Sequence, residues 1–181
     1  MPTTGTKLYT YRDGAWQVVY AELFSDQERP NIIKAFELSL SATDFTPEQT
    51  WEERIEDRGS QITFSALGQQ APVREKEHWD PDLAKRKVIQ ADLRTRLPGL
   101  SINIGGATSI DITQKGVDKG YGLMKLQITS GIPLEQMMVI GDAIFPGGND
   151  HPAKEIGLET IRVKNPDGTL TAIAAIVACL K

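Results

Sequence analysis

The sequence predicts an α/β protein, because its hydrophobic pattern changes twice along the chain. Residues 1–25 indicate a β-hairpin, residues 26–112 combine helices with short, closely paired strands, and residues 113–181 alternate single strands with helices. Strands in close pairs favour an antiparallel sheet with helices on it, whereas regular alternation favours a parallel sheet. Parallel sheets bind ligands at the carboxyl ends of their strands, so functional residues are expected there.

The first part carries a strong hairpin signal. Lys7–Tyr11 and Ala15–Tyr20 are rich in aromatic and β-branched residues, and Asp13-Gly14 lies between them. Asp-Gly suits the tight turn that joins two antiparallel strands, because both residues tolerate a positive φ. A hairpin is therefore expected over residues 7–20.

The middle part mixes the helical and the strand period. Helical spacing occurs over residues 32–38 and 81–97. Strand patterns occur over residues 50–56, 61–67, 100–104 and 108–112. The second helix has a proline in its first turn, and its expected buried side consists of Leu83, Ile89, Leu93 and Leu97. An antiparallel sheet covered by two helices is the expected result.

The last part repeats helix and strand. Helices are expected over residues 119–129, 152–156 and 170–180, and strands over residues 137–140 and 159–163. Parallel sheets are normally covered on both faces, and two strands offer too little surface to bury these helices. Further strands are therefore expected to complete this sheet.

Composition excludes several classes of protein. With 181 residues, of which 40% are hydrophobic and 24% charged, the chain can form one ordinary domain or two small ones. A net charge of -4 gives no basic surface for nucleic acid, and no apolar run reaches the ~18 residues of a membrane span. The single cysteine, Cys179, cannot form an intrachain disulfide, and no signal peptide is recognisable, so a cytoplasmic protein is expected.

Residues 138–150 join an apolar strand to a glycine-rich loop with two aspartates, Asp142 and Asp150. Gly147 and Gly148 allow the loop to turn tightly enough to bring the two carboxylates together. Mg²⁺ prefers one or two protein carboxylates together with water and phosphate oxygens, so this acidic loop predicts a magnesium site for phosphate chemistry. Capping is the alternative, in which each aspartate stabilises free amide groups by ~0.5–2 kcal/mol.

Two further groups of polar residues could serve the same site. Lys119 stands at the start of a helix, where the helix dipole disfavours a cation that has no anionic partner. A bound phosphate or a nearby carboxylate would supply that partner, although a solvated lysine beside Asp118 is the alternative. Ser109 and Asp111 share one face of a strand, where they could bind ligand hydroxyl groups or form an ordinary polar sheet face.

Together these segments resemble the haloacid dehalogenase (HAD) superfamily, in particular its type IIB cap branch with phosphomannomutase-like and sugar-phosphatase members. The similarity rests on GGATSIDITQKGVDKGYGL and IGDAIFPGGND at their mutual spacing, and it covers nearly the whole chain. It implies a partial Rossmann-like HAD core with a parallel sheet, made of residues 1–25 and 113–181. Residues 26–112 would form an α+β cap with an antiparallel sheet, which sets substrate specificity.

The resemblance implies a Mg²⁺-dependent hydrolase that acts on a phosphorylated sugar. In this family an aspartate attacks phosphorus, Mg²⁺ bridges the reactants, and a lysine neutralises the developing charge. The positions that match the family are Lys119 for the phosphate and nucleophile, Asp142, Asn149 and Asp150 for the metal, and Arg58, Ser109 and Asp111 for the substrate.

The chain departs from this family at the nucleophile. The motif Asp-x-Asp-x-Thr after an apolar strand is absent, and the only Asp-x-Asp, Asp80-Pro81-Asp82, is typical of a helix start. We therefore expect a C-terminal portion of a longer enzyme that is inactive alone. The parent is expected to be a phosphatase, because Gln69-Gln70 stands where a mutase would have a second cap arginine. A phosphohexomutase and a non-catalytic sugar-phosphate-binding fragment are the alternatives.

Overall fold

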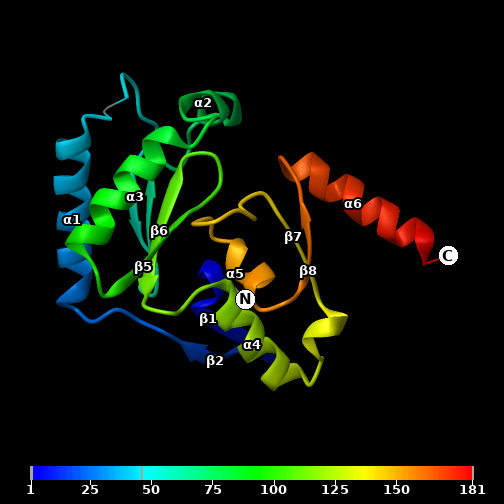
Figure 1. Cartoon of the computed structure of the whole chain (residues 1–181). Coiled ribbons are helices and arrows are strands. Elements are labelled where there is room, and N and C mark those ends of the chain that lie inside the picture. Colours follow the sequence, from blue (N-terminus) through cyan, green and yellow to red (C-terminus); the bar gives the residue numbers. More distant parts are fainter. Residues whose placement is uncertain (1, 46, 181) are drawn as a thin grey trace.

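A computed structural model describes residues 2–45 and 47–180, which form three sheets with helices packed around them (Figure 1). The strands are β1 (Lys7–Arg12), β2 (Ala15–Ala21), β3 (Ile55–Asp57), β4 (Ile62–Ser65), β5 (Leu100–Ile104), β6 (Ser109–Gln114), β7 (Met138–Gly141) and β8 (Glu159–Arg162). The helices are α1 (Glu28–Thr43), α2 (Val73–Trp79), α3 (Ala84–Arg96), α4 (Lys119–Ser130), α5 (His151–Glu155) and α6 (Pro166–Cys179), with short 3₁₀ turns η1 (Thr3–Gly5) and η2 (Leu134–Gln136). In the two described ranges, no helix is long and apolar enough to cross a membrane.

The largest sheet is antiparallel, with the strand order β3-β4-β6-β5 and with α1 and α3 on one face (Figure 1). Side chains alternate between its faces. Ile62 and Phe64 of β4 and Ile110 and Ile112 of β6 are fully buried in the core beneath the helices. The intervening polar residues face the other way, toward the acidic loop, so the sheet separates a hydrophobic core from a polar surface.

The expected second helix of the middle part is confirmed, but it begins at Ala84 and not at Pro81. The start is set by Asp80, whose carboxylate accepts hydrogen bonds from the backbone amides of Lys85 and Arg86 at 3.0 and 3.1 Å. A carboxylate that accepts from free helical amides fixes the first turn, while Leu83 in front of it takes a left-handed backbone conformation.

Two details of the middle part differ from the sequence prediction. Residues 73–79 form α2, which was not expected because the helix buries none of its described side chains and therefore has no apolar stripe. The strand expected over residues 50–56 is shorter, and only β3 pairs with β4. The other expected strands and helices are all present in the described residues.

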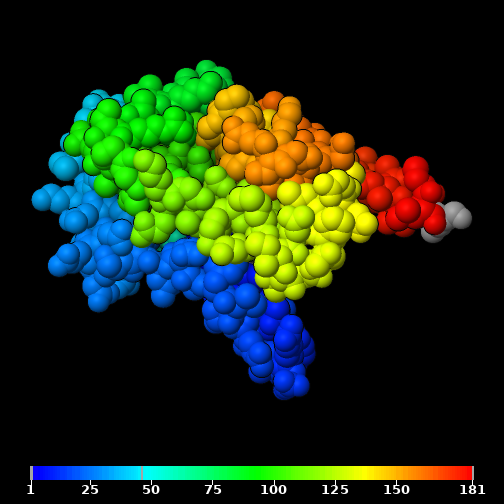
Figure 2. Space-filling view, turned by 60° about the horizontal axis from the view of Figure 1, so that its bottom comes forward, coloured from blue at the N-terminus to red at the C-terminus, as the bar shows by residue number. Residues whose placement is uncertain are grey.

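The parallel sheet consists of β7 and β8, as the alternation of elements predicts. Its helix α6 is apolar, yet within its described length it buries no side chain, and Leu170 and Ile173 are 66% and 46% exposed. Figure 2 shows α6 in red and the β1-β2 hairpin in dark blue projecting from the body of the molecule. Two strands therefore leave α6 largely uncovered, in agreement with the sequence-based expectation.

The hairpin packs against α4 through aromatic residues. The rings of Tyr20 and Tyr121 meet edge to face with 6.0 Å between their centroids, and Tyr121 Oη donates a 2.5 Å hydrogen bond to Glu22. On the same interface, a Cβ atom on Gly5 would lie 2.9 Å from the carbonyl oxygen of Asp118 and 3.0 Å from the Cα of Gly122, so glycine at position 5 allows the two backbones to approach closely. The N-terminal hairpin is thus attached to the C-terminal part of the chain.

This interface predicts an unusual tyrosine titration. The hydrogen bond to Glu22, aided by burial, raises the pKa of Tyr121 to about 12, because a tyrosinate would lie against a carboxylate. The folded-state pKa is raised, so the stabilisation is complete below the unfolded pKa and is lost as pH rises through about 12. Ultraviolet titration should show one late-titrating tyrosine that Tyr121→Phe removes. Identical alkaline curves for the two proteins would contradict the contact.

Candidate functional site

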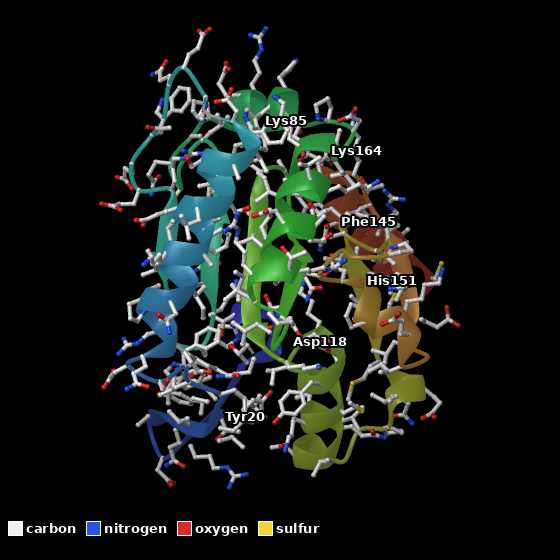
Figure 3. All side chains as sticks on the ribbon, turned by 60° about the vertical axis from the view of Figure 1, so that its left-hand side comes forward. Tyr20, Lys85, Asp118, Phe145, His151 and Lys164 are labelled. Carbon is white, nitrogen blue, oxygen red and sulfur yellow. The ribbon has the colours of Figure 1, made fainter. Side chains whose placement is uncertain are left out.

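Lys119 is the first residue of α4, and the local sequence explains its position. Asp118 caps the helix by accepting a 2.9 Å hydrogen bond from the amide of Tyr121. Gly120 lies against the carbonyl of Pro152, where a Cβ atom would be only 3.0 Å away, so α4 and α5 can approach closely. Figure 3 labels Asp118 at this helix start. The cap and the glycine fix the direction in which Lys119 leaves the helix.

The anionic partner that Lys119 needs is Asp150. Lys119 Nζ donates to Asp150 Oδ1, and the backbone amide of Ala143 donates to Asp150 Oδ2 at 3.0 Å. Asp150 is only 2% exposed, so its charge depends on these two donors. Although Asp150 precedes α5, its side chain makes no capping hydrogen bond there. Capping therefore does not explain Asp150.

Asp142 and Asp150 lie together, as the sequence predicts. Both line one cavity of about 470 Å³, together with Lys119 and residues at the start of α6 such as Asn165 and Thr169. Asp142 is exposed, and in the part of the chain that the structure describes no donor hydrogen-bonds to its carboxylate. One carboxylate is thus engaged and the other is available to a ligand in the same cavity.

This arrangement suits a loosely held hard cation more than a closed metal cage. Within the described ranges, no group of three or more histidine, cysteine, aspartate or glutamate side chains could hold a metal together. The chain instead offers a free carboxylate on Asp142 beside the buried carboxylate of Asp150. Mg²⁺ commonly uses one or two carboxylates and completes its coordination with water and substrate oxygens. The residues present fit such a partial Mg²⁺ site.

The polar face of the antiparallel sheet contributes a buried hydrogen-bond network centred on Asp111. Gln61 Nε2 and Thr63 Oγ1 donate to Asp111 Oδ1 at 2.8 and 2.9 Å. Asn149 Nδ2 donates to Asp111 Oδ2 at 3.1 Å, so the network continues into the acidic loop. Thr4 Oγ1 extends it at the other end by donating to Gln61. One network therefore connects η1, the sheet and the acidic loop.

Burial raises the pKa of the Asp111 carboxyl above its ordinary value. The hydrogen bonds from Thr63 and Asn149 and the charges of Arg58 and Lys119 oppose this rise. Both carboxylate oxygens of Asp111 already accept hydrogen bonds from the protein, which makes Asp111 a link between the sheet and the acidic loop in this conformation.

Arg58 follows the edge strand β3, whereas Ser109 lies on the central strand β6. Arg58 Nη2 donates to Glu56 at 2.6 Å, and both side chains are partly exposed. Ser109 begins β6 and is also partly exposed. The structure brings Lys119, Asp142 and Asp150 to one cavity and gathers Ser109, Asp111 and Asn149 around Gly105, whereas Arg58 pairs with Glu56.

Sequence patterns alone did not identify Gln61, Thr63 and Gly141. Thr63 lies on β4 opposite Asp111, Gln61 directly precedes β4, and the two-residue period of this buried segment was the available signal. Gly141 ends β7, and the Asp150 carboxylate occupies the space where a Cβ atom would lie. No local sequence pattern marks a glycine that must lack a side chain because a residue further along the chain occupies that space.

The fold is that of the HAD superfamily. An IMP-bound mutant of the Plasmodium falciparum IMP-nucleotidase has a TM-score of 0.59 and 17% identity, covering 95% of this chain and 46% of that chain. A putative HAD/COF-like hydrolase from Plasmodium vivax has a TM-score of 0.55 and 15% identity, covering 98% of this chain and 72% of that one. At such identities the likeness concerns the fold.

Within the superfamily, the family model of the eukaryotic phosphomannomutases matches residues 11–179, and the chain belongs to that family. A phosphomannomutase of Arabidopsis thaliana is 33% identical over 129 residues, which make up 67% of this chain and 50% of the relative. One from Schizosaccharomyces pombe is 30% identical over 131 residues, with 67% and 49% covered. The chain therefore spans about half the length of the curated relatives it matches.

Proposed function

We propose that this chain supplies the lysine and the acidic loop of a Mg²⁺-dependent phosphoryl-transfer site for a sugar phosphate. The observation that carries this proposal is the pair of Lys119 and Asp150 in a cavity shared with the free carboxylate of Asp142. A cation fixed beside two carboxylates suits a phosphoryl group and its metal ion, because each charge has an opposite partner. Membership of the phosphomannomutase family supports a sugar phosphate as the substrate.

Each residue has a defined task in this proposal. Lys119 binds the phosphoryl oxygens, and the buried contact with Asp150 keeps its ammonium group at the start of α4. Asp142 and Asp150 hold Mg²⁺ with Asn149 in support, and the bound metal would offset the negative charge of the phosphate. Arg58, after β3, and Ser109, at the start of β6, bind the sugar or a distal phosphate.

The proposed domains follow the three parts of the sequence. Residues 26–112 form the type IIB cap, and residues 1–25 and 113–181 belong to the core. The contact between the hairpin and α4 supports assigning both core pieces to one unit. The contact between Asp111 and Asn149 supports a cap whose polar face closes the site and excludes water.

The nucleophile is proposed to come from outside these residues. Asp80 is bonded to Arg86 and to two helix amides, and Asp82 accepts a hydrogen bond from the amide of Ala84 at 3.1 Å. The carboxylate of Asp80 is therefore already engaged, and neither aspartate lines the cavity of Lys119, Asp142 and Asp150. A strand with an attacking aspartate, added beside β7, would also bury more of the apolar surface of α6.

We therefore expect that the 181-residue chain alone does not hydrolyse p-nitrophenyl phosphate or hexose phosphates with Mg²⁺ above the level of its Lys119→Ala variant. Released inorganic phosphate is the measurement. Turnover that is lost in Asp142→Ala would show that the chain has its own nucleophile and would refute this part of the proposal. Calorimetric binding of Mg²⁺ with a hexose phosphate, weakened in Asp142→Ala, would separate an inactive binding module from an inert chain.

Hydrolysis is the preferred reaction, and transfer between two positions of the sugar is the second candidate. Gln69 and Gln70 support hydrolysis, because a mutase needs additional positive charge for a second phosphate. Lys76 does not supply it in this conformation, since its ammonium group donates to the carbonyl of Gln69 at 2.8 Å. The family supports the mutase, because the curated relatives are named phosphomannomutases. Supplying the proposed nucleophile segment and identifying the product, phosphate or an isomeric hexose phosphate, decides between them.

A further inference from the structure

The acidic loop does not stand alone, because it docks on the free edge of the antiparallel sheet. The amide of Ile104, at the end of β5, donates to the carbonyl of Gly147 at 2.9 Å. The amide of Asn149 donates back to the carbonyl of Ile104 at 2.9 Å. Ile104 and Gly148 thus form a parallel β-bridge. The loop extends the sheet beyond β5 and takes its position from that edge.

Gln90 on α3 joins this loop to the sheet from the side. Its Nε2 group donates to the carbonyl of Ile102 at 2.7 Å and to the carbonyl of Gly147 at 3.2 Å. The side chain is only 5% exposed, so water competes poorly for these two bonds. Gly147 has a φ of +87°, and the Gln90 carboxamide lies against it. One buried amide group therefore holds strand β5 and the acidic loop together.

We propose that Gln90 is a positioning residue for the acidic loop, acting through the carbonyl of Gly147. When that carbonyl is fixed, the residues that follow it in the chain are fixed as well. Among them, the Asn149 side chain donates to Asp111, and the Asp150 carboxylate accepts from the amide of Ala143. Gln90 contacts neither the cavity nor any proposed metal ligand directly. The relevance of the loop's placement to Mg²⁺ binding rests on the proposed function, whereas the support of the loop by Gln90 does not.

Arg94 provides the matched control. It lies one turn further along α3, and its Nη2 group donates to the same Ile102 carbonyl at 3.2 Å, but it makes no hydrogen bond to the acidic loop in the described residues. If the only role of Gln90 were to donate a hydrogen bond to the Ile102 carbonyl of β5, loss of Gln90 or of Arg94 would have similar consequences. A positioning role requires that only the loss of Gln90 loosens the loop.

The test is hydrogen exchange of backbone amides by NMR in Gln90→Leu and Arg94→Met. Asn149 reports on the loop, and Ala66, whose buried amide donates to Thr108, reports on the sheet. In Gln90→Leu, exchange at Asn149 should accelerate about five- to tenfold relative to Ala66, the effect of one net hydrogen bond. Arg94→Met should leave the ratio unchanged. An unchanged ratio in Gln90→Leu, or an equal change in both variants, would overturn the proposal.

A second variant and a second readout keep the outcomes distinct. Gln90→Met retains the length of the side chain without its donor, and it replaces Gln90→Leu if leucine prevents folding. Mg²⁺ titration monitored at the Asn149 amide should show weaker binding in the Gln90 variant than in Arg94→Met. If Mg²⁺ fails to bind the unmodified chain while the exchange ratio changes as expected, the proposed function fails and the positioning role stands.

Discussion

Replacing Arg86 by methionine is expected to lower the free energy of unfolding by about 3 to 5 kcal/mol, because it leaves a buried carboxylate without its cation. The side chains of Arg86 and Asp80 are 2% and 0% exposed, and Arg86 Nε donates to Asp80 Oδ2 at 2.8 Å. Arg86 Nη1 also donates to the carbonyls of Gly105 and Gly106. The substitution therefore also removes the hydrogen bonds that support Gly105 and Gly106, and Gly106 lies close to Asp142.

Arg96→Met is the control, because it breaks an ion pair on the same helix at the surface. Arg96 and Asp92 are joined by two hydrogen bonds of 2.6 and 3.2 Å, but their side chains are 31% and 27% exposed. Water screens an exposed pair of this kind, so its loss should change the free energy of unfolding far less than the loss of the buried pair. Urea unfolding followed by circular dichroism measures both variants. Equal losses would mean that burial does not determine the strength of the Arg86 pair.

The fold could be predicted where the spacing of apolar residues along the sequence indicates which side chains are buried. The antiparallel sheet and α3 were found because their apolar residues recur with the period of a strand or a helix. Arg86 and Gln90 of α3 were missed as buried residues, although Ile89 and Leu93 beside them were expected there. A charged side chain becomes buried only where the fold supplies partners for its charge. For Arg86 these partners are Asp80 and the carbonyls of Gly105 and Gly106.

The site was predictable where the residue type itself carries the chemistry. Lys119, Asp142 and Asp150 were recognised because a cation at a helix start and carboxylates at a strand end need partners. The supporting residues could not be recognised in that way. Gln90 and Gly141 act by hydrogen-bonding to a backbone carbonyl and by leaving space for a carboxylate, and both relations depend on the three-dimensional arrangement.

Replacing Gly141 by alanine is expected to displace the Asp150 carboxylate and to destabilise the protein by about 1 to 3 kcal/mol, the usual cost of overpacking. A Cβ atom at this position would lie 2.2 Å from Asp150 Oδ2 and 2.6 Å from its Cγ, far inside contact distance. Asp150 cannot move without losing its bonds to Lys119 and Ala143. Urea unfolding gives the stability, and exchange at the Ala143 amide reports on the carboxylate.

The steric cause of this effect can be separated from a general intolerance of alanine. In Gly106→Ala the new Cβ atom would be 3.6 Å from Asp142 Oδ2, an ordinary contact, so the change should stay within about 0.5 kcal/mol. Combining Gly141→Ala with Asp150→Ala removes the group that the methyl would strike. The double variant should then be more stable than the sum of the single effects predicts. Additive losses would show that Gly141 is needed for a reason other than the space it leaves for Asp150.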